Sequence, residues 1–221
     1  MTSSQAFRQA AHAIWEANYA HPFVQGIGDG TLPQERFRFY LAQDYVYLID
    51  FSRFFALAAA KAARLAPMER FAKLLDETLH FEMDLHRAIC AEFGISRQEL
   101  ERTRPTPTCL GYTSYLLRVA YEGEAASLLA ALLPCSWGYG EIGLRLRGRG
   151  LPPVPPYAKW IETYASPEYQ ELVGWLRTLF DETVGDMGGA HRLRLQEVFD
   201  ASSRWEYLFW EMAWKMEPWP V

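Results

Sequence analysis

The sequence predicts an all-α protein, a helical bundle of about seven or eight helices. Apolar residues recur at helical spacing along most of the chain, and no run alternates apolar and polar residues over the length of a strand. Half of the 221 residues are hydrophobic and 15% are aromatic, so the chain can bury a large core. This length fits one domain, and we expect residues 1–221 to form a single helical domain.

The helices can be placed from periodicity and from their start and stop signals. Serines that can cap a helix precede the first one, which is expected over residues 3–20. The segment HPFVQGIGDGTLP (21–33) is rich in glycine and proline and is expected to be an ordered loop. The proline-rich segment 148–157 is expected to be an extended connector. Further helices are expected near 33–65, 68–93, 108–122, 124–147, 157–165, 168–185 and 189–216.

The composition indicates which binding partners and which cellular compartment to expect. The net charge of −5 argues against nucleic acid, and the arginines of GLRLRGRG (143–150) fit a solvated helix end. Three cysteines, Cys90, Cys109 and Cys135, are too few and odd in number for a disulfide framework, which favours reduced thiols and a cytoplasmic protein. The first residues do not resemble a secretory signal, and no stretch reaches the roughly 20 apolar residues of a membrane helix. We therefore expect no membrane partner.

An unusual stretch, LLPCSWGYGEIG (132–143), lies inside an expected helix. Pro134 cannot donate a backbone hydrogen bond to residue 130, and it directly precedes Cys135. Three glycines, each costing about 1 kcal/mol relative to alanine in a helix, follow at Gly138, Gly140 and Gly143. A cysteine alone is most often a small buried hydrophobic residue. The stretch indicates either a thinned helix wall beside a reactive thiol or close packing of neighbouring helices, and the sequence leaves both open.

Two carboxylates border apolar helix faces. Asp44 and Tyr47 in LAQDYVYL are three residues apart and share one face, so Asp44 must be solvated, paired or bound to a ligand. A carboxylate at the exposed edge of that face is an equally open reading.

Near the end of the chain, Trp205, Phe209, Met212 and Met216 are expected to form one buried stripe. Glu206 borders this stripe, and burial there would raise its pKa and make it a proton donor near neutral pH. Periodicity barely prefers Glu206 over Glu211.

A third pattern suggests metal ligands. Glu77 and His80 have the Glu-x-x-His spacing of helical di-iron sites, and His86 lies nearby. Such sites need two copies of the motif, and the sequence holds one. A structural histidine is the stronger reading, and we expect no metal. A metal-dependent oxidase on the same bundle remains the alternative.

These segments, in order, resemble one family, thiaminase II or TenA. The resemblance runs through HPFVQGIGDGTLP, QDYVYL, PTPTCLGYTSYL, ALLPCSWGYGEIG, KWIETYAS and SSRWEYLFWEMAW, and covers essentially the whole chain. It implies a heme-oxygenase-like helical bundle without heme, assembled as a homotetramer. It also implies hydrolysis of thiamin or of aminomethylpyrimidine fragments to hydroxymethylpyrimidine for thiamin salvage.

The resemblance assigns roles to seven residues. Cys135 matches the nucleophile of the family's cysteine-type branch, Glu206 the acid and Tyr47 the phenol that activates the thiol. Asp44 matches the carboxylate that binds the aminopyrimidine, and the pocket tyrosines are Tyr112, Tyr139 and Tyr164. This chemistry needs no metal or organic cofactor. A non-catalytic aminopyrimidine-binding or regulatory protein is a second alternative, and the sequence does not choose between thiamin and the aminomethylpyrimidine as substrate.

Overall fold

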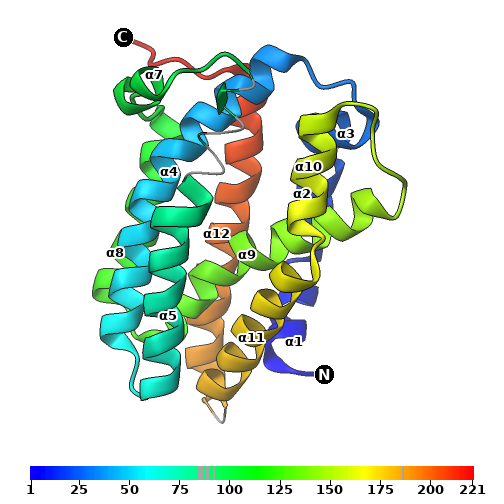
Figure 1. Cartoon of the computed structure of the whole chain (residues 1–221). Coiled ribbons are helices and arrows are strands. Elements are labelled where there is room, and N and C mark those ends of the chain that lie inside the picture. The colour runs from blue at the N-terminus through cyan, green and yellow to red at the C-terminus, as the bar shows by residue number, and fades with distance from the viewer. Residues whose placement is uncertain (84–86, 88–89, 92, 186) are drawn as a thin grey trace. The chain divides into compact units, whose positions relative to one another are not determined.

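The computed structural model describes the chain except residues 84–86, 88–89, 92 and 186 and the side chains of Phe81 and Glu82. All regular secondary structure in the described part is helical, which confirms the all-α prediction (Figure 1). The helices fall into two compact units. Unit 1 comprises Met1–Leu32 and Leu129–Glu211, and unit 2 comprises Pro33–Leu128 and Met212–Val221. The single domain over 1–221 stays a prediction.

Unit 1 contains α1 (Ser3–Ala10), α2 (His12–Ala20), α3 (Pro22–Asp29), α10 (Pro155–Tyr164) and α11 (Pro167–Val184). It also contains most of α9 (Ala125–Arg147) and of α12 (Gly189–Lys215). Within this unit α1 packs against α11, and α10 packs against both α3 and α11.

Unit 2 contains α4 (Gln34–Lys61), α5 (Leu65–Glu77), the π-helical turn η1 (Thr78–Glu82), α7 (Arg97–Arg102) and α8 (Pro107–Glu122). The first residues of α9 and the last residues of α12 also belong to it. The long helix α4 packs along both α5 and α8, and Figure 1 shows these three helices side by side.

Capping residues fix where the helices begin. The Thr2 side chain accepts a hydrogen bond from the backbone of the first turn of α1 and forms a capping box with Gln5. The Thr106 side chain caps α8 by accepting from Cys109 N, and the Ser166 side chain caps α11 by accepting from Tyr169 N. In both of these helices a proline occupies the first turn, where its missing N–H would have no helical partner.

Short helical segments depart from the expected pattern. The expected loop 21–33 is wrong over much of its length, because Pro22–Asp29 forms α3. His21 caps this helix by accepting a hydrogen bond from Phe23 N at 3.1 Å, and Gly30, with a φ of 71°, ends it. The expected first helix divides into α1 and α2 at Ala11, and α7 was not predicted. These short helices occur in addition to the long helices that the periodicity predicted.

The glycines of α9 have two different surroundings. A Cβ on Gly143 would lie 2.8 Å from the carbonyl carbon of Tyr164, and one on Gly140 would lie 3.1 Å from Gln170 Nε2. These two glycines therefore permit close packing against α10 and α11. A Cβ on Gly138 would meet nothing within 4 Å, so Gly138 borders open space. The close-packing reading of the stretch is confirmed at Gly140 and Gly143, and the helix wall is thin at Gly138, while a reactive thiol at Cys135 stays a prediction.

The buried face of α12 differs from the expected stripe, because it includes Glu206 and Trp210 in place of Trp205 and Met216. Phe209 and Met212 are buried, but Trp205 is half-buried and Met216 is 41% exposed, so the predicted stripe is wrong at both ends. The buried residues of α12 in unit 1 are Leu195, Phe199, Ser202, Ser203, Glu206, Phe209 and Trp210. Glu206, at 6% exposure, lies inside the buried face rather than beside it.

No helix in the described part of the chain is long and apolar enough to cross a membrane.

Candidate active site

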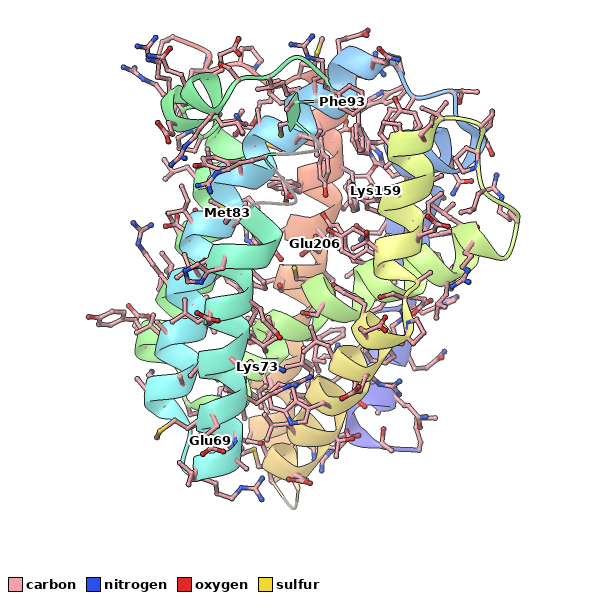
Figure 2. The ribbon with its side chains drawn as sticks, in the orientation of Figure 1. Glu69, Lys73, Met83, Phe93, Lys159 and Glu206 are labelled. Atoms are coloured by element: carbon pink, nitrogen blue, oxygen red, sulfur yellow. The ribbon has the colours of Figure 1, made fainter. Side chains whose placement is uncertain are left out.

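A small recess in unit 1 contains Glu206. Its walls come from α2, α9 and α12, and they include Asn18, Pro134, Gly138, Tyr139, Glu206 and Trp210. Figure 2 shows Glu206 on α12. The recess has room for about one water molecule. A carboxyl group, the proline inside α9 and an open glycine, all singled out in the sequence, therefore line one recess.

The segment of α12 before Glu206 is held by buried hydroxyl groups. Ser202 Oγ donates to Ala131 O on α9 at 2.6 Å, one turn before Cys135. Ser203 Oγ donates to Phe199 O at 2.8 Å and accepts from Trp15 Nε1 on α2 at 3.0 Å. Buried polar groups with defined partners give a helix a fixed rotation. These bonds set the direction in which α12 presents Glu206.

An aromatic cluster surrounds Tyr139 on α9. Its ring centroid lies 4.9 Å from that of Tyr164, 5.0 Å from Trp210 and 5.8 Å from Trp160. Tyr139 is 8% exposed and Tyr164 is half-buried. Two of the residues that the resemblance assigns to the substrate pocket are thus in edge-to-face contact within unit 1.

The three cysteines differ in accessibility. Cys90 and Cys109 are fully buried, and burial, with a smaller effect of the Asp44 charge, raises the pKa of each thiol to about 12. Cys135 on α9 is only partly buried. Because the thiolate is the reactive form, the two buried thiols are poor nucleophiles near neutral pH. Cys135 is the thiol that accessibility favours.

Unit 2 brings together the other three predicted site residues. Asp44 and Tyr47 lie on α4 and Tyr112 on α8, and the two tyrosine rings are 5.4 Å apart. Tyr112 is 1% exposed. Asp44 is half-buried overall, but the loss of solvent around its carboxyl raises its pKa to about 7. At neutral pH this carboxyl both accepts and releases a proton readily.

Gln43 was missed in the sequence, although it is a polar residue on the buried side of α4. Its Nε2 donates to Arg104 O at 3.1 Å, and its Oε1 accepts from Thr106 N at 2.9 Å. Thr106 is the residue that caps α8. Gln43 therefore fixes the start of the helix that carries Tyr112. The available signal was that a buried amide requires partners in the fold.

Glu211, the rival of Glu206, has a structural partner. Its carboxylate is 3.0 Å from His21 Nε2. Because His21 Nδ1 already accepts from Phe23 N, the Nε2 nitrogen carries the hydrogen and donates it to Glu211. The Glu211 side chain is 29% exposed, in contrast to the buried Glu206. Glu211 thereby supports the cap of α3.

Comparison with known proteins identifies the family of this chain. A family model described as TENA/THI-4/PQQC matches residues 8–216. The chain belongs to the TENA/THI-4/PQQC family. It is 46% identical over 220 residues to the aminopyrimidine aminohydrolase of Halalkalibacterium halodurans, with 99% of this chain and 98% of that protein aligned. The resemblance inferred from the sequence segments is confirmed, and the cysteine-type branch stays a prediction.

Solved structures support the fold of this TENA/THI-4/PQQC member. A TenA homologue from P. horikoshii superposes with a TM-score of 0.91 at 33% identity, covering 97% of this chain and 99% of that chain. A domain with a heme oxygenase-like fold from Shewanella denitrificans gives a TM-score of 0.75 at 15% identity over 96% and 92% of the two chains. The latter likeness concerns the fold alone, and the predicted heme-oxygenase-like bundle is confirmed.

Two of the possible metal ligands, Glu77 and His80, form ion pairs with residues one helical turn away. Glu77, on α5, lies 3.4 Å from Lys73, and the exposed His80 lies 3.1 Å from the Asp76 carboxylate. His86 lies outside the described residues. Within the described part of this family member, no three histidine, cysteine, aspartate or glutamate side chains are grouped as metal ligands would be.

We predict that Asp44→Asn stabilises the protein at alkaline pH. Burial raises the Asp44 pKa from 3.8 to about 7, so the folded state holds this proton more tightly than the unfolded state. Its contribution to the free energy of unfolding is therefore lost progressively as the pH rises from about 4 through about 7. Asparagine has no charge to bury, and we expect a gain of about 1–3 kcal/mol at pH 8 that shrinks towards pH 5.

Denaturant unfolding at both pH values measures this difference. Asp50→Asn is the matched control on α4, because the Asp50 carboxylate pairs with Arg53 near the surface. A gain for Asp44→Asn that is larger at pH 5 than at pH 8 would contradict the prediction.

Proposed function

We propose that this chain is a hydrolase that converts thiamin or aminomethylpyrimidine compounds to hydroxymethylpyrimidine, an aminopyrimidine aminohydrolase of the thiaminase II type. The name of the Halalkalibacterium relative supports this proposal, because the alignment extends over nearly the whole of both chains. The substrate is a small molecule. We further propose a single-domain, cytoplasmic homotetramer with neither nucleic acid nor membrane as partner.

The burial of Glu206 is the observation that carries the proposal. A carboxyl group that is 6% exposed and surrounded by Tyr139, Trp210 and the proline of α9 suits a proton donor better than a surface charge. The partly accessible thiol of Cys135 lies on the same helix as Tyr139 and Pro134. An acid and a nucleophile are the two groups that the proposed hydrolysis requires.

The proposed reaction begins with activation of the ring. An aminopyrimidine is a poor electrophile until a ring nitrogen is protonated, and Glu206 donates that proton. Asp44 accepts a hydrogen bond from the amino group, and a charged acceptor strengthens this bond. The side chains of Tyr112, Tyr139 and Tyr164 line the substrate ring.

Covalent catalysis then divides the substitution into two steps. The Cys135 thiolate, activated by the phenol of Tyr47, adds to the unsubstituted ring carbon. The ring electrons expel the thiazole or the amine from the exocyclic methylene. A water molecule adds to the methylene and loses a proton, after which the sulfur leaves and the aromatic ring is restored. No step uses a metal or an organic cofactor.

We predict that the purified protein forms hydroxymethylpyrimidine from thiamin, from aminomethylpyrimidine, or from both. Mass spectrometry of parallel incubations identifies the product and ranks the substrates by kcat/KM. Iron at one or more equivalents, with oxygen consumption and no hydroxymethylpyrimidine, would favour the metal-dependent oxidase. Tight binding of the pyrimidine without any turnover would favour a binding or regulatory protein.

We predict that Cys135→Ser loses nearly all turnover and remains folded. Serine keeps the size of the side chain but is a much weaker nucleophile at neutral pH than a thiolate. Cys90→Ser and Cys109→Ser are the controls and should stay active, provided that circular dichroism shows them folded. A covalent pyrimidine adduct detected by intact-mass measurement on wild type should be missing in Cys135→Ser. Near-normal turnover in that variant would refute the covalent mechanism.

We predict that Glu206→Gln abolishes turnover while substrate binding is largely kept. The amide has nearly the same shape but cannot give a proton to the ring. Glu211→Gln is the matched control on α12, since glutamine retains an oxygen that can accept from His21, and it should cost at most a few fold. Side-by-side measurement of kcat and of affinity by calorimetry tests this. The reverse order of rates would mean that the acid is the other carboxylate.

A further inference from the structure

The recess beside Glu206 contains a buried acceptor whose direction is fixed. Asn18 on α2 is 6% exposed, and its Nδ2 donates to Ile14 O at 3.0 Å and to Ser203 O at 3.1 Å. Two carbonyl groups can be satisfied only by the NH₂ end of the amide, so the oxygen must point away from them. Asn18 Oδ1 is buried and has no hydrogen-bond partner in the described part of the chain.

An unpaired buried acceptor requires an explanation. Leaving such a group without a partner destabilises the folded state, so native proteins usually satisfy it with protein or ordered water. Asn18 lines the recess, whose free space fits about one water molecule. The recess thus has room for one small hydrogen-bond donor, of the size of a water molecule, beside Asn18.

Gly138 provides part of the space. A Cβ at this position would meet no atom within 4 Å, whereas a Cβ at Gly140 or Gly143 would meet neighbouring atoms at 3.1 Å or less. Pro134, one turn earlier on α9, forms the adjacent wall. The absence of a side chain at Gly138 therefore keeps the recess open, a role distinct from the packing role of the other two glycines.

The rim of the recess reaches the protein surface. Its outer lining includes Glu141 and Arg145, whose side chains are 25% and 32% exposed. Arg145 pairs with Glu141 at 2.6 Å and with Glu16 at 2.7 Å, and Arg8 pairs with Glu141 at 2.7 Å. Since these charges are paired with one another, none of them needs to enter the recess. Asn18 and Glu206 line the same recess, and the charged side chains of its rim have partners of their own.

We propose that the recess binds one ordered water molecule, which donates a hydrogen to Asn18 Oδ1, contacts the Glu206 carboxyl and returns to Glu206 the proton that it gives to the substrate. This proposal rests on the proposed function. After Glu206 has protonated the ring, the water passes one proton to the carboxylate and receives another from solvent at the rim, so the water itself is unchanged. The ring nitrogen releases its proton to solvent when the sulfur leaves and the product departs, so the cycle takes up and returns one proton. Asn18 is a positioning residue, because it acts through the water.

Gly138→Ala tests the site without removing any hydrogen bond. The added methyl group fills free space, and alanine favours the helix, so the variant should fold. Gly174→Ala on α11 is the matched control, since a Cβ there also meets nothing within 4 Å and Gly174 does not line the recess. Crystal structures should show a water within hydrogen-bond distance of Asn18 Oδ1 in wild type and Gly174→Ala, and none in Gly138→Ala. A dry recess in wild type overturns the proposal.

Kinetics tests the proton route separately. Reprotonation of Glu206 follows the first proton transfer, so Gly138→Ala should lower multiple-turnover kcat by about threefold or more and leave the single-turnover rate close to that of Gly174→Ala. Equal kcat values for the two variants overturn the route. If wild type turns over no aminopyrimidine, the proposed function fails, while the crystal structures still decide whether the water site exists.

Discussion

The close approach of α9 to its neighbours in unit 1 is the constraint on which the rest of that unit depends. Gly143 faces the backbone of Tyr164 at a distance that leaves no room for a Cβ. Because the two helices meet there, the rings of Tyr139 and Tyr164 come within 4.9 Å of each other. The same helix lines the recess at Gly138, where a Cβ would meet no neighbouring atom within 4 Å. One helix therefore uses glycine for contact on one side and for space on another.

Several polar groups near Glu206 make hydrogen bonds to other parts of the protein. The hydroxyl of Ser202 donates to α9, the hydroxyl of Ser203 accepts from Trp15 on α2, and the NH₂ group of Asn18 donates to two carbonyl groups. The oxygen of Asn18, which also lines the recess, accepts no hydrogen bond from the described part of the chain. The burial of this carboxyl is the feature on which its proposed role as a proton donor rests. Glu211, by contrast, is used by His21 to support a helix cap.

In unit 2 the fold controls ionisation through burial. The same loss of solvent that raises the pKa of Asp44 to about 7 raises those of Cys90 and Cys109 to about 12. The two thiols are thereby made unreactive, and the carboxyl is poised near neutral pH. Gln43 holds the start of α8 against α4, so that Asp44 and Tyr112 are presented by helices whose register is fixed.

The sequence by itself determined most of the long helices but not the short α3 and α7, because periodicity and caps such as Thr106 and Ser166 are local signals that short segments carry weakly. Together with the family resemblance, it also nominated Cys135 and Glu206. Only the tertiary structure decided which face of α12 is buried, because neighbouring residues differ by about 100° and their apolar patterns overlap. Likewise, the recess depends on Asn18 bonding to Ser203, 185 residues away. Helical spacing in the sequence shows which residues share one face of a helix. Whether that face is buried depends on contacts with distant segments, which form only when the chain folds.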